Sequence, residues 1–136
     1  MKKIVFIAFA MVGLVACLKT NNIPPSERIL VPITISATNL PDTANVGDTI
    51  VAAVRVTAPN LCYRFEGFDS FNSGEKQYDI QAVGSKPNPD LPSTGCEQTV
   101  YVKDTTFKFK LPFTGKYVLR FYNGQQIFSA DTLIIK

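Results

Sequence analysis

The amino-acid sequence predicts an all-β protein: an antiparallel β-sandwich of about seven or eight short strands that follows an N-terminal export segment. After residue 25, apolar and polar residues alternate with a period of two in several short runs, and no run keeps a helical period. Pro, Gly, Asn and Asp interrupt these runs at regular spacing, as residues in turns between strands do.

The first half of this region contains three expected strands. Alternating apolar residues predict them at 29–35, 50–57 and 61–66. The segment 40–48 contains Pro, Asp and Gly and predicts a turn, and Pro59-Asn60 separates the second strand from the third. Residues 69–74 are polar and contain Gly74, so they are expected to form a loop.

The second half contains four more expected strands, at 78–82, 100–111, 117–121 and 126–135. A longer loop is expected over 84–95, which holds three prolines and two glycines. Asn123-Gly124 is the strongest hairpin signal in the chain and predicts a tight turn between the last two strands.

Two segments add a resemblance to this pattern. The run Leu111-Pro112-Phe113-Thr114-Gly115-Lys116-Tyr117, continuing to Phe121, resembles the corner before a late strand in immunoglobulin-like domains, where a tyrosine bonds back to the backbone. Val46-Gly47-Asp48-Thr49-Ile50 resembles the turn into an early strand of bacterial immunoglobulin-like modules. The resemblance implies an immunoglobulin-like β-sandwich over residues 28–136.

The start of the chain has the three parts of a secretory signal peptide over residues 1–16. Lys2 and Lys3 precede an uncharged apolar run from Ile4 to Val15, which is shorter than the roughly 20 residues that span a membrane. Its end, Leu14-Val15-Ala16-Cys17, resembles the lipobox of bacterial lipoproteins, and the whole chain resembles small envelope lipoproteins of the Bacteroidetes type. The resemblance implies that Cys17 becomes the lipid-modified first residue, anchored in a membrane.

Residues 17–27 are polar and then Pro-rich, which predicts a flexible tether between the lipid and the domain at 28–136. Leu18 is not the Asp that marks inner-membrane retention in the lipoproteins that this segment resembles. By that resemblance the chain is expected at the outer membrane. The periplasmic face is favoured over the cell surface, because no acidic export signal follows Cys17.

Two cysteines remain once Cys17 carries lipid. Cys62 and Cys96 are expected to form a disulfide, because an exported domain permits one and two thiols allow a single pairing. Two separate thiols are the alternative. The chain has no His, so these cysteines make a poor zinc site, and no metal or cofactor is expected.

Composition disfavours several functions. After Lys2 and Lys3 are removed, twelve Lys and Arg remain against eleven Asp and Glu, a balance that argues against nucleic-acid binding. The absence of His removes the commonest general base, so a non-enzyme is expected. The enzymatic alternative is a carboxylate-based glycan hydrolase, which would use acids among Glu66, Asp69, Glu75 and Asp79.

The sequence therefore predicts a non-catalytic envelope module that binds a protein or a glycan, or supports an envelope complex. Phe68 and Phe71 are the candidate binding residues, because they lie in the polar stretch 67–74, expected to be a loop, and loop aromatics often bind partners. The alternative role for both rings is to cap the core. A protease inhibitor that presents the Pro-rich loop at 86–95 is a further alternative.

Four Asp-Thr pairs resemble the O-glycosylation sequence of exported Bacteroidetes proteins. Their threonines are Thr43, Thr49, Thr105 and Thr132. The resemblance implies candidate O-glycosylation sites, although Asp-Thr is equally typical of junctions between turns and strands.

Overall fold

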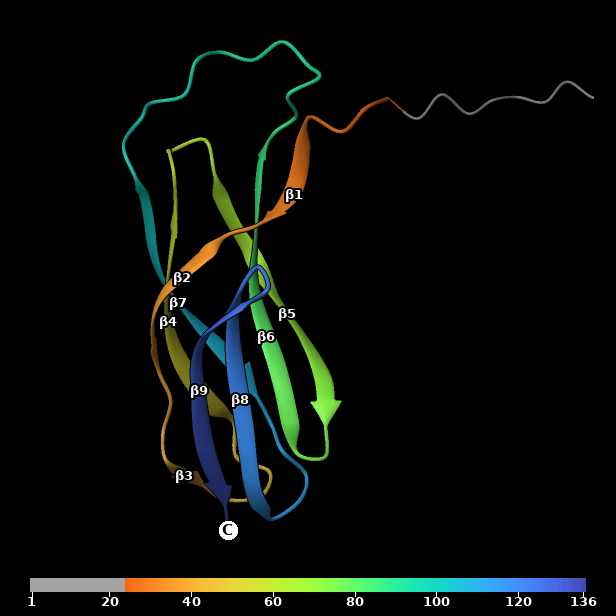
Figure 1. Cartoon of the computed structure of the whole chain (residues 1–136), viewed down its shortest axis with the longest axis vertical. Helices are drawn as coiled ribbons and strands as arrows, with labels where there is room; N and C mark the ends of the chain where they lie inside the picture. Colours follow the sequence, from red (N-terminus) through yellow and green to blue (C-terminus); the bar gives the residue numbers. More distant parts are fainter. Residues whose placement is uncertain (1–23) are drawn as a thin grey trace, which may run out of the picture.

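A computed structural model describes residues 24–136 of the chain, and these residues form nine β-strands and no helix (Figure 1). The strands are β1 (Arg28–Pro32), β2 (Thr34–Asn39), β3 (Thr43–Ala44), β4 (Ile50–Ala58), β5 (Arg64–Gly74), β6 (Gln77–Pro87), β7 (Tyr101–Phe109), β8 (Gly115–Asn123) and β9 (Gln126–Ile135). The predicted all-β sandwich is confirmed. The signal peptide expected at 1–16 and the lipid attachment expected at Cys17 lie outside the described residues. Within residues 24–136, no helix is long and apolar enough to cross a membrane.

The strands form two sheets. The larger sheet has the order β1-β6-β8-β9-β3, and β5 pairs with the other edge of β6. The strands β1 and β8 share one edge of β6, because β1 pairs with its C-terminal half and β8 with its N-terminal half. The smaller sheet has the order β2-β4-β7.

Two neighbouring pairs of strands are parallel, which departs from the antiparallel arrangement that the sequence predicts. These pairs are β3 with β9 and β6 with β8. After β6 the chain crosses to the smaller sheet and returns along β7, so β8 runs in the same direction as β6. We therefore describe the fold as a two-sheet β-sandwich.

The core lies between the sheets and follows the alternation in the sequence. In β4, Ile50, Ala52, Val54 and Val56 are buried, while the residues between them are exposed. The facing residues of the larger sheet are equally enclosed, and they include Ile80, Leu119, Phe121 and Leu133. Side chains of two sheets that interdigitate in this way supply most of the apolar burial of a sandwich.

The loop that the sequence predicts at 69–74 is not found, because these residues belong to strand β5. Its pairing with β6 continues to Gly74 opposite Gln77, so this stretch is a strand. Register shifts between Phe65 and Gly67 and between Asn72 and Gly74 are bulges, which disturb the period of two by which a strand is recognised. Strand β6 likewise continues through Pro87, beyond the start of the loop expected from residue 84.

Gly84, in the interior of β6, has no room for a side chain, because the backbone of Arg64 and the side chain of Ile33 lie too close to it. A Cβ atom at this position would lie 2.6 Å from the carbonyl oxygen of Arg64 and 2.7 Å from Cγ2 of Ile33. A glycine in a strand interior often marks such an approach, and here it permits β6 to carry partners on both edges.

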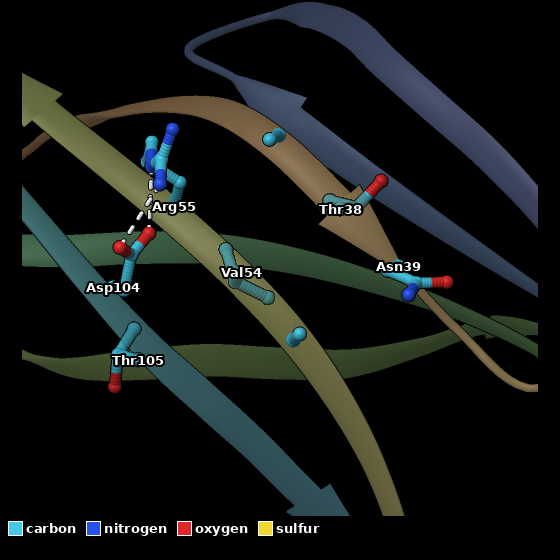
Figure 2. A pocket seen from close by; sticks show the side chains of 8 residues that line it. Thr38, Asn39, Val54, Arg55, Asp104 and Thr105 are labelled. Carbon is cyan, nitrogen blue, oxygen red and sulfur yellow. Dashed lines mark hydrogen bonds and ion pairs between the residues drawn. The ribbon is translucent and has the colours of Figure 1, made fainter.

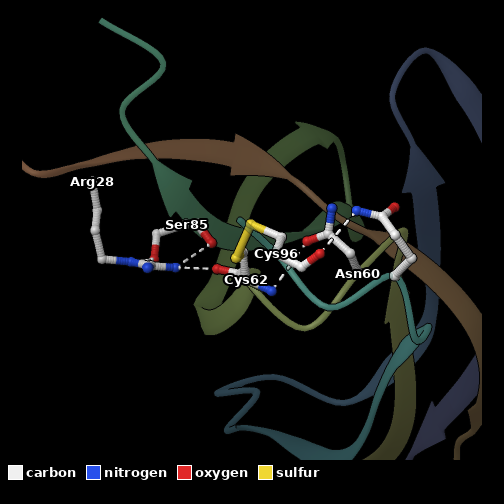
Figure 3. The surroundings of a disulfide bond; sticks show 6 residues. Arg28, Asn60, Cys62, Ser85 and Cys96 are labelled. Carbon is white, nitrogen blue, oxygen red and sulfur yellow. Dashed lines mark hydrogen bonds between the residues drawn. A yellow bond between two sulfur atoms is a disulfide. The ribbon is translucent and has the colours of Figure 1, made fainter. Parts of the chain in front are cut away.

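The predicted disulfide is present between Cys62 and Cys96, whose Cα atoms are 5.6 Å apart (Figure 3). It joins the β4–β5 connection to the long β6–β7 connection at one end of the sandwich. The guanidinium of Arg28 donates hydrogen bonds to the carbonyl oxygen of Cys62 (2.7 Å) and to Ser85. We call this end, formed by residues 24–28, 59–63 and 88–100, the disulfide pole.

The expected turns of the last three strands are also found. The buried Tyr117 hydroxyl donates a hydrogen bond to the carbonyl oxygen of Phe113 (3.1 Å), as the corner resemblance implied. The predicted hairpin joins β8 to β9, and Gly124 takes the positive φ of +62° that its turn requires. The side chain of Asn123 then reaches across to bond both backbone groups of Ile35, which ties the hairpin to the smaller sheet.

Candidate functional site

The strands β5, β6, β8 and β9 lie side by side in the larger sheet (Figure 1). Their pairing aligns two rows of side chains on the outer face of this sheet. The first row is Phe71, Asp79, Arg120 and Ala130, and the second row is Asp69, Gln81, Tyr122 and Ile127. The residues between these positions, such as Ile80, Leu119 and Phe121, point into the core. Because strand side chains alternate, the two rows share the outer face.

A shallow depression of about 310 Å³ opens between these rows. Its lining residues are Phe71, Asp79, Gln81, Tyr122, Gly124 and Gln125. We call it the Phe71–Tyr122 depression. It combines two aromatic rings with amide and carboxylate groups, a mixture that suits an amphipathic ligand.

An ion pair lies at the centre of this face. Nε of Arg120 is 2.7 Å from Oδ1 of Asp79, and a second nitrogen of Arg120 is 2.7 Å from Oδ2. The guanidinium also lies 5.4 Å from the ring centroid of Tyr122. The hydrogen bonds from Arg120 lower the pKa of Asp79 below its ordinary value, so this carboxyl stays ionised.

The two predicted binding residues lie on opposite faces of β5, and both belong to a strand where a loop was expected. The ring of Phe68 packs between those of Phe65 and Phe107, at centroid distances of 5.0 and 5.4 Å. Phe68 thus takes the alternative role in the core. Phe71 is 54% exposed and borders the depression. The two phenylalanines are three positions apart in the strand, and an odd spacing places strand side chains on opposite faces.

Sequence reasoning missed Arg120, Tyr122 and Gln81 as members of the site. They lie in segments that the sequence marks only as strands, and no short motif joins them. The alternation in β8 does predict that Arg120 and Tyr122 point away from the buried Leu119 and Phe121. Their position beside Phe71 depends on the pairing of β5, β6 and β8, which the sequence pattern does not reveal.

The four acids considered for hydrolysis occupy different environments. Glu66 accepts a hydrogen bond from the Ser85 hydroxyl, Asp79 is held by Arg120, and Asp69 and Glu75 are exposed. Within residues 24–136, no three His, Cys, Asp or Glu side chains gather where they could hold a metal ion. Because Asp79 stays ionised, it is not in the protonated form that a general acid needs.

The candidate glycosylation sites differ in exposure. Thr43, Thr49 and Thr132 are exposed, the first in β3, the second before β4 and the third within β9. Thr105 is half-buried in β7, where it lies opposite the buried Val54. A modifying enzyme therefore has better access to the first three threonines than to Thr105.

A second depression, also of about 310 Å³, lies along the smaller sheet (Figure 2). Arg55 and Asp104 border it and form a two-pronged ion pair at 2.6 and 3.0 Å. Both side chains are more than half exposed. Their mutual hydrogen bonds use the charged groups of this depression, and its lining contains no aromatic ring, unlike that of the Phe71–Tyr122 depression.

Comparison with known proteins places the chain in no family. No protein-family model matches it, and neither does any curated protein or any solved structure.

Proposed function

We propose that this chain is a lipid-anchored, non-catalytic lipoprotein of the bacterial outer membrane whose β-sandwich binds a glycan. The segment Leu14-Val15-Ala16-Cys17 supports the anchor, with the lipid on Cys17 and the domain on the periplasmic face. The observation that carries the binding proposal is the Phe71–Tyr122 depression, where aromatic rings and hydrogen-bonding groups share one open surface.

The chemistry of this face favours a sugar over a protein. The apolar C–H face of a pyranose ring stacks on an aromatic ring, and the amides of Gln81 and Gln125 can each donate to and accept from sugar hydroxyls. A stable protein interface buries about 800 Å² on each partner and is depleted of charge at its centre. Here the ion pair of Asp79 and Arg120 occupies the centre.

The alternatives receive less support. A hydrolase needs one protonated and one ionised carboxyl at matched positions, and Arg120 keeps Asp79 ionised. An inhibitor would present the loop at 86–95 to a protease. Asn88 in this loop bonds Ser26 and Glu27, so the loop lies where the tether enters the domain.

The binding proposal is tested with the full lipidated protein, solubilised in detergent and applied to an array of bacterial envelope glycans. Phe71→Ala removes an exposed ring without opening the core, so folding is retained and binding falls at least about tenfold. Phe113→Ala is the matched control, because Phe113 is 69% exposed and lies outside the depression. Equal binding by parent and Phe71→Ala contradicts the glycan site.

The anchor is tested separately by growth with radiolabelled palmitate. The parent takes up label and sediments with outer membranes, whereas Cys17→Ser takes up none, because serine offers no thiol to alkylate. An unlabelled parent contradicts the lipoprotein assignment, whatever the glycan array shows.

A further inference from the structure

The tether enters the domain at the disulfide pole and is held there. The carbonyl oxygen of Ser26 accepts a hydrogen bond from the Asn88 side chain (3.0 Å), and that of Glu27 accepts one from the Asn88 backbone (2.9 Å). Arg28 then bonds the carbonyl oxygen of Cys62, beside the disulfide (Figure 3). The direction of entry is therefore set by the folded domain.

Little chain separates this pole from the proposed lipid on Cys17. Between Cys17 and Pro24 there are seven peptide steps. A fully extended chain gains at most about 3.6 Å per residue, so these steps span no more than roughly 25 Å. A domain tethered so closely keeps the disulfide pole nearer to the bilayer than the opposite end, where Phe113 lies.

Large apolar side chains are exposed at this pole and beside it. Leu61 is 46% exposed in the β4–β5 connection, and Val100 is 56% exposed just before β7. Leu30 in β1 is 71% exposed and pairs with Ser85, which Arg28 contacts. Leu61 and Val100 belong to segments of the disulfide pole, and Leu30 follows Arg28, which holds the chain there.

A backbone hydrogen bond and the disulfide hold together the two connections that carry Leu61 and Val100. The backbone N–H of Leu61 donates a hydrogen bond to the carbonyl oxygen of Glu97 (3.2 Å), and the disulfide lies in the residues next to both. Ala58 pairs with Tyr101, which fixes the position of Val100 beside the β4–β5 connection. A backbone held in this way needs no further ordering when these side chains leave water.

From these observations we infer that the disulfide pole lies on the lipid bilayer, with Leu61 and Val100 inserted into the interface and Leu30 at the rim. The inference rests on the proposed lipid anchor, which keeps the pole within roughly 25 Å of the membrane surface. Charges of both signs surround the pole, among them Arg64, Glu97 and Asp90, so apolar contact dominates and added salt has little effect. The end of the sandwich that carries Phe113 points away from the membrane.

The chain contains no tryptophan, so a single introduced tryptophan reports its own surroundings. The full lipidated protein with Leu61→Trp is reconstituted in phosphatidylcholine vesicles whose acyl chains carry bromine, which quenches nearby indole. We expect the emission maximum of Leu61→Trp to shift to shorter wavelength when the protein is in vesicles. We expect its fluorescence intensity to be lower by roughly half or more in brominated vesicles than in unbrominated ones. Phe113→Trp at the far end is the matched control and stays unquenched.

Each outcome separates the two proposals. If the protein floats with the vesicles but Leu61→Trp is not quenched, or if both probes are quenched equally, the docking inference is overturned and the anchor stands. If the parent does not float with the vesicles, the anchor itself fails. Val100→Trp gives the same readout from a second segment, in case Leu61→Trp does not form its disulfide on a non-reducing gel.

Discussion

Individual side chains on the larger sheet are held by paired interactions, and Asp79 is the clearest case. It lies on the outer face of the sheet yet is only 8% exposed, with both carboxylate oxygens bound by Arg120. Its lowered pKa means that the native state favours the ionised form more strongly than the unfolded chain does. This pair both orders the candidate site and contributes to stability.

Acidification removes that contribution. Since the folded pKa of Asp79 is lowered, its stabilisation is complete above the pKa of the unfolded chain and is lost as the pH falls below about 4. We expect the melting temperature of the parent to fall over this range more steeply than that of Asp79→Asn, in scanning calorimetry from pH 7 to pH 2.5. Asp104→Asn is the control, because its pair with Arg55 is exposed and contributes less. Parallel curves for parent and Asp79→Asn contradict the assignment.

The hydroxyl of Tyr117 supplies a second test at a single residue. Tyr117→Phe removes the hydrogen bond to the carbonyl oxygen of Phe113 and leaves the buried ring in place. We expect the free energy of unfolding in urea to fall by about 1 kcal/mol. Tyr122→Phe, on the outer face, is expected to change it by less than half as much.

The strands show how local pattern and pairing combine. Alternation alone predicts β4 correctly, because β4 is regular and is paired along its whole length with β7. For residues 69–74 of β5 the sequence predicts a loop, and this prediction is wrong, because two bulges and a polar sequence hide the period of two. Backbone hydrogen bonds to β6 hold it as a strand, and these bonds do not depend on side-chain type.

The close contacts of β6 predict the effect of adding one carbon atom. Gly84→Ala would place Cβ 2.6 Å from the carbonyl oxygen of Arg64, which is backbone and cannot move alone. We expect a loss of about 2 kcal/mol in unfolding free energy, measured by chemical denaturation. Gly67→Ala in the neighbouring strand is the matched control, because its Cβ would meet nothing within 4 Å. A neutral Gly84→Ala contradicts the packing described for this strand.

At the scale of the whole molecule, the disulfide and the residues that enter the fold define one end of the sandwich. Cys62 and Cys96 are 34 residues apart in sequence and link the β4–β5 connection covalently to the β6–β7 connection. The described residues also begin at this end, with Pro24. The disulfide therefore braces the part of the domain that we place on the membrane.

Removing the disulfide tests whether it stabilises this end of the domain. The double variant Cys62→Ser, Cys96→Ser is expected to lose about 3 to 4 kcal/mol of unfolding free energy, because the open chain gains loop entropy. The measurement is guanidinium unfolding, and the parent with reductant is expected to match the double variant. A parent that is unaffected by reductant contradicts the stabilising role of the bridge.

The fold class and the disulfide partners could be predicted from the sequence, and the Tyr117 corner from a resemblance that the sequence carries. Each depends on a local or countable feature: period-two alternation, two remaining thiols, or a short run of residues. The export signal and lipid attachment are also sequence predictions, which stay open to the tests above. Hydrophobic alternation is a reliable guide because it states directly which side chains must leave water.

Which strands are neighbours could not be predicted from the sequence pattern. Phe71, Asp79 and Arg120 come from three strands, and no periodicity in one strand reveals the register of another. The parallel pairing of β6 with β8 has the same origin, because it depends on how the chain crosses between sheets through β7. Pairing depends on backbone hydrogen bonds and on packing between distant segments, and that is why the candidate site becomes visible only in the folded chain.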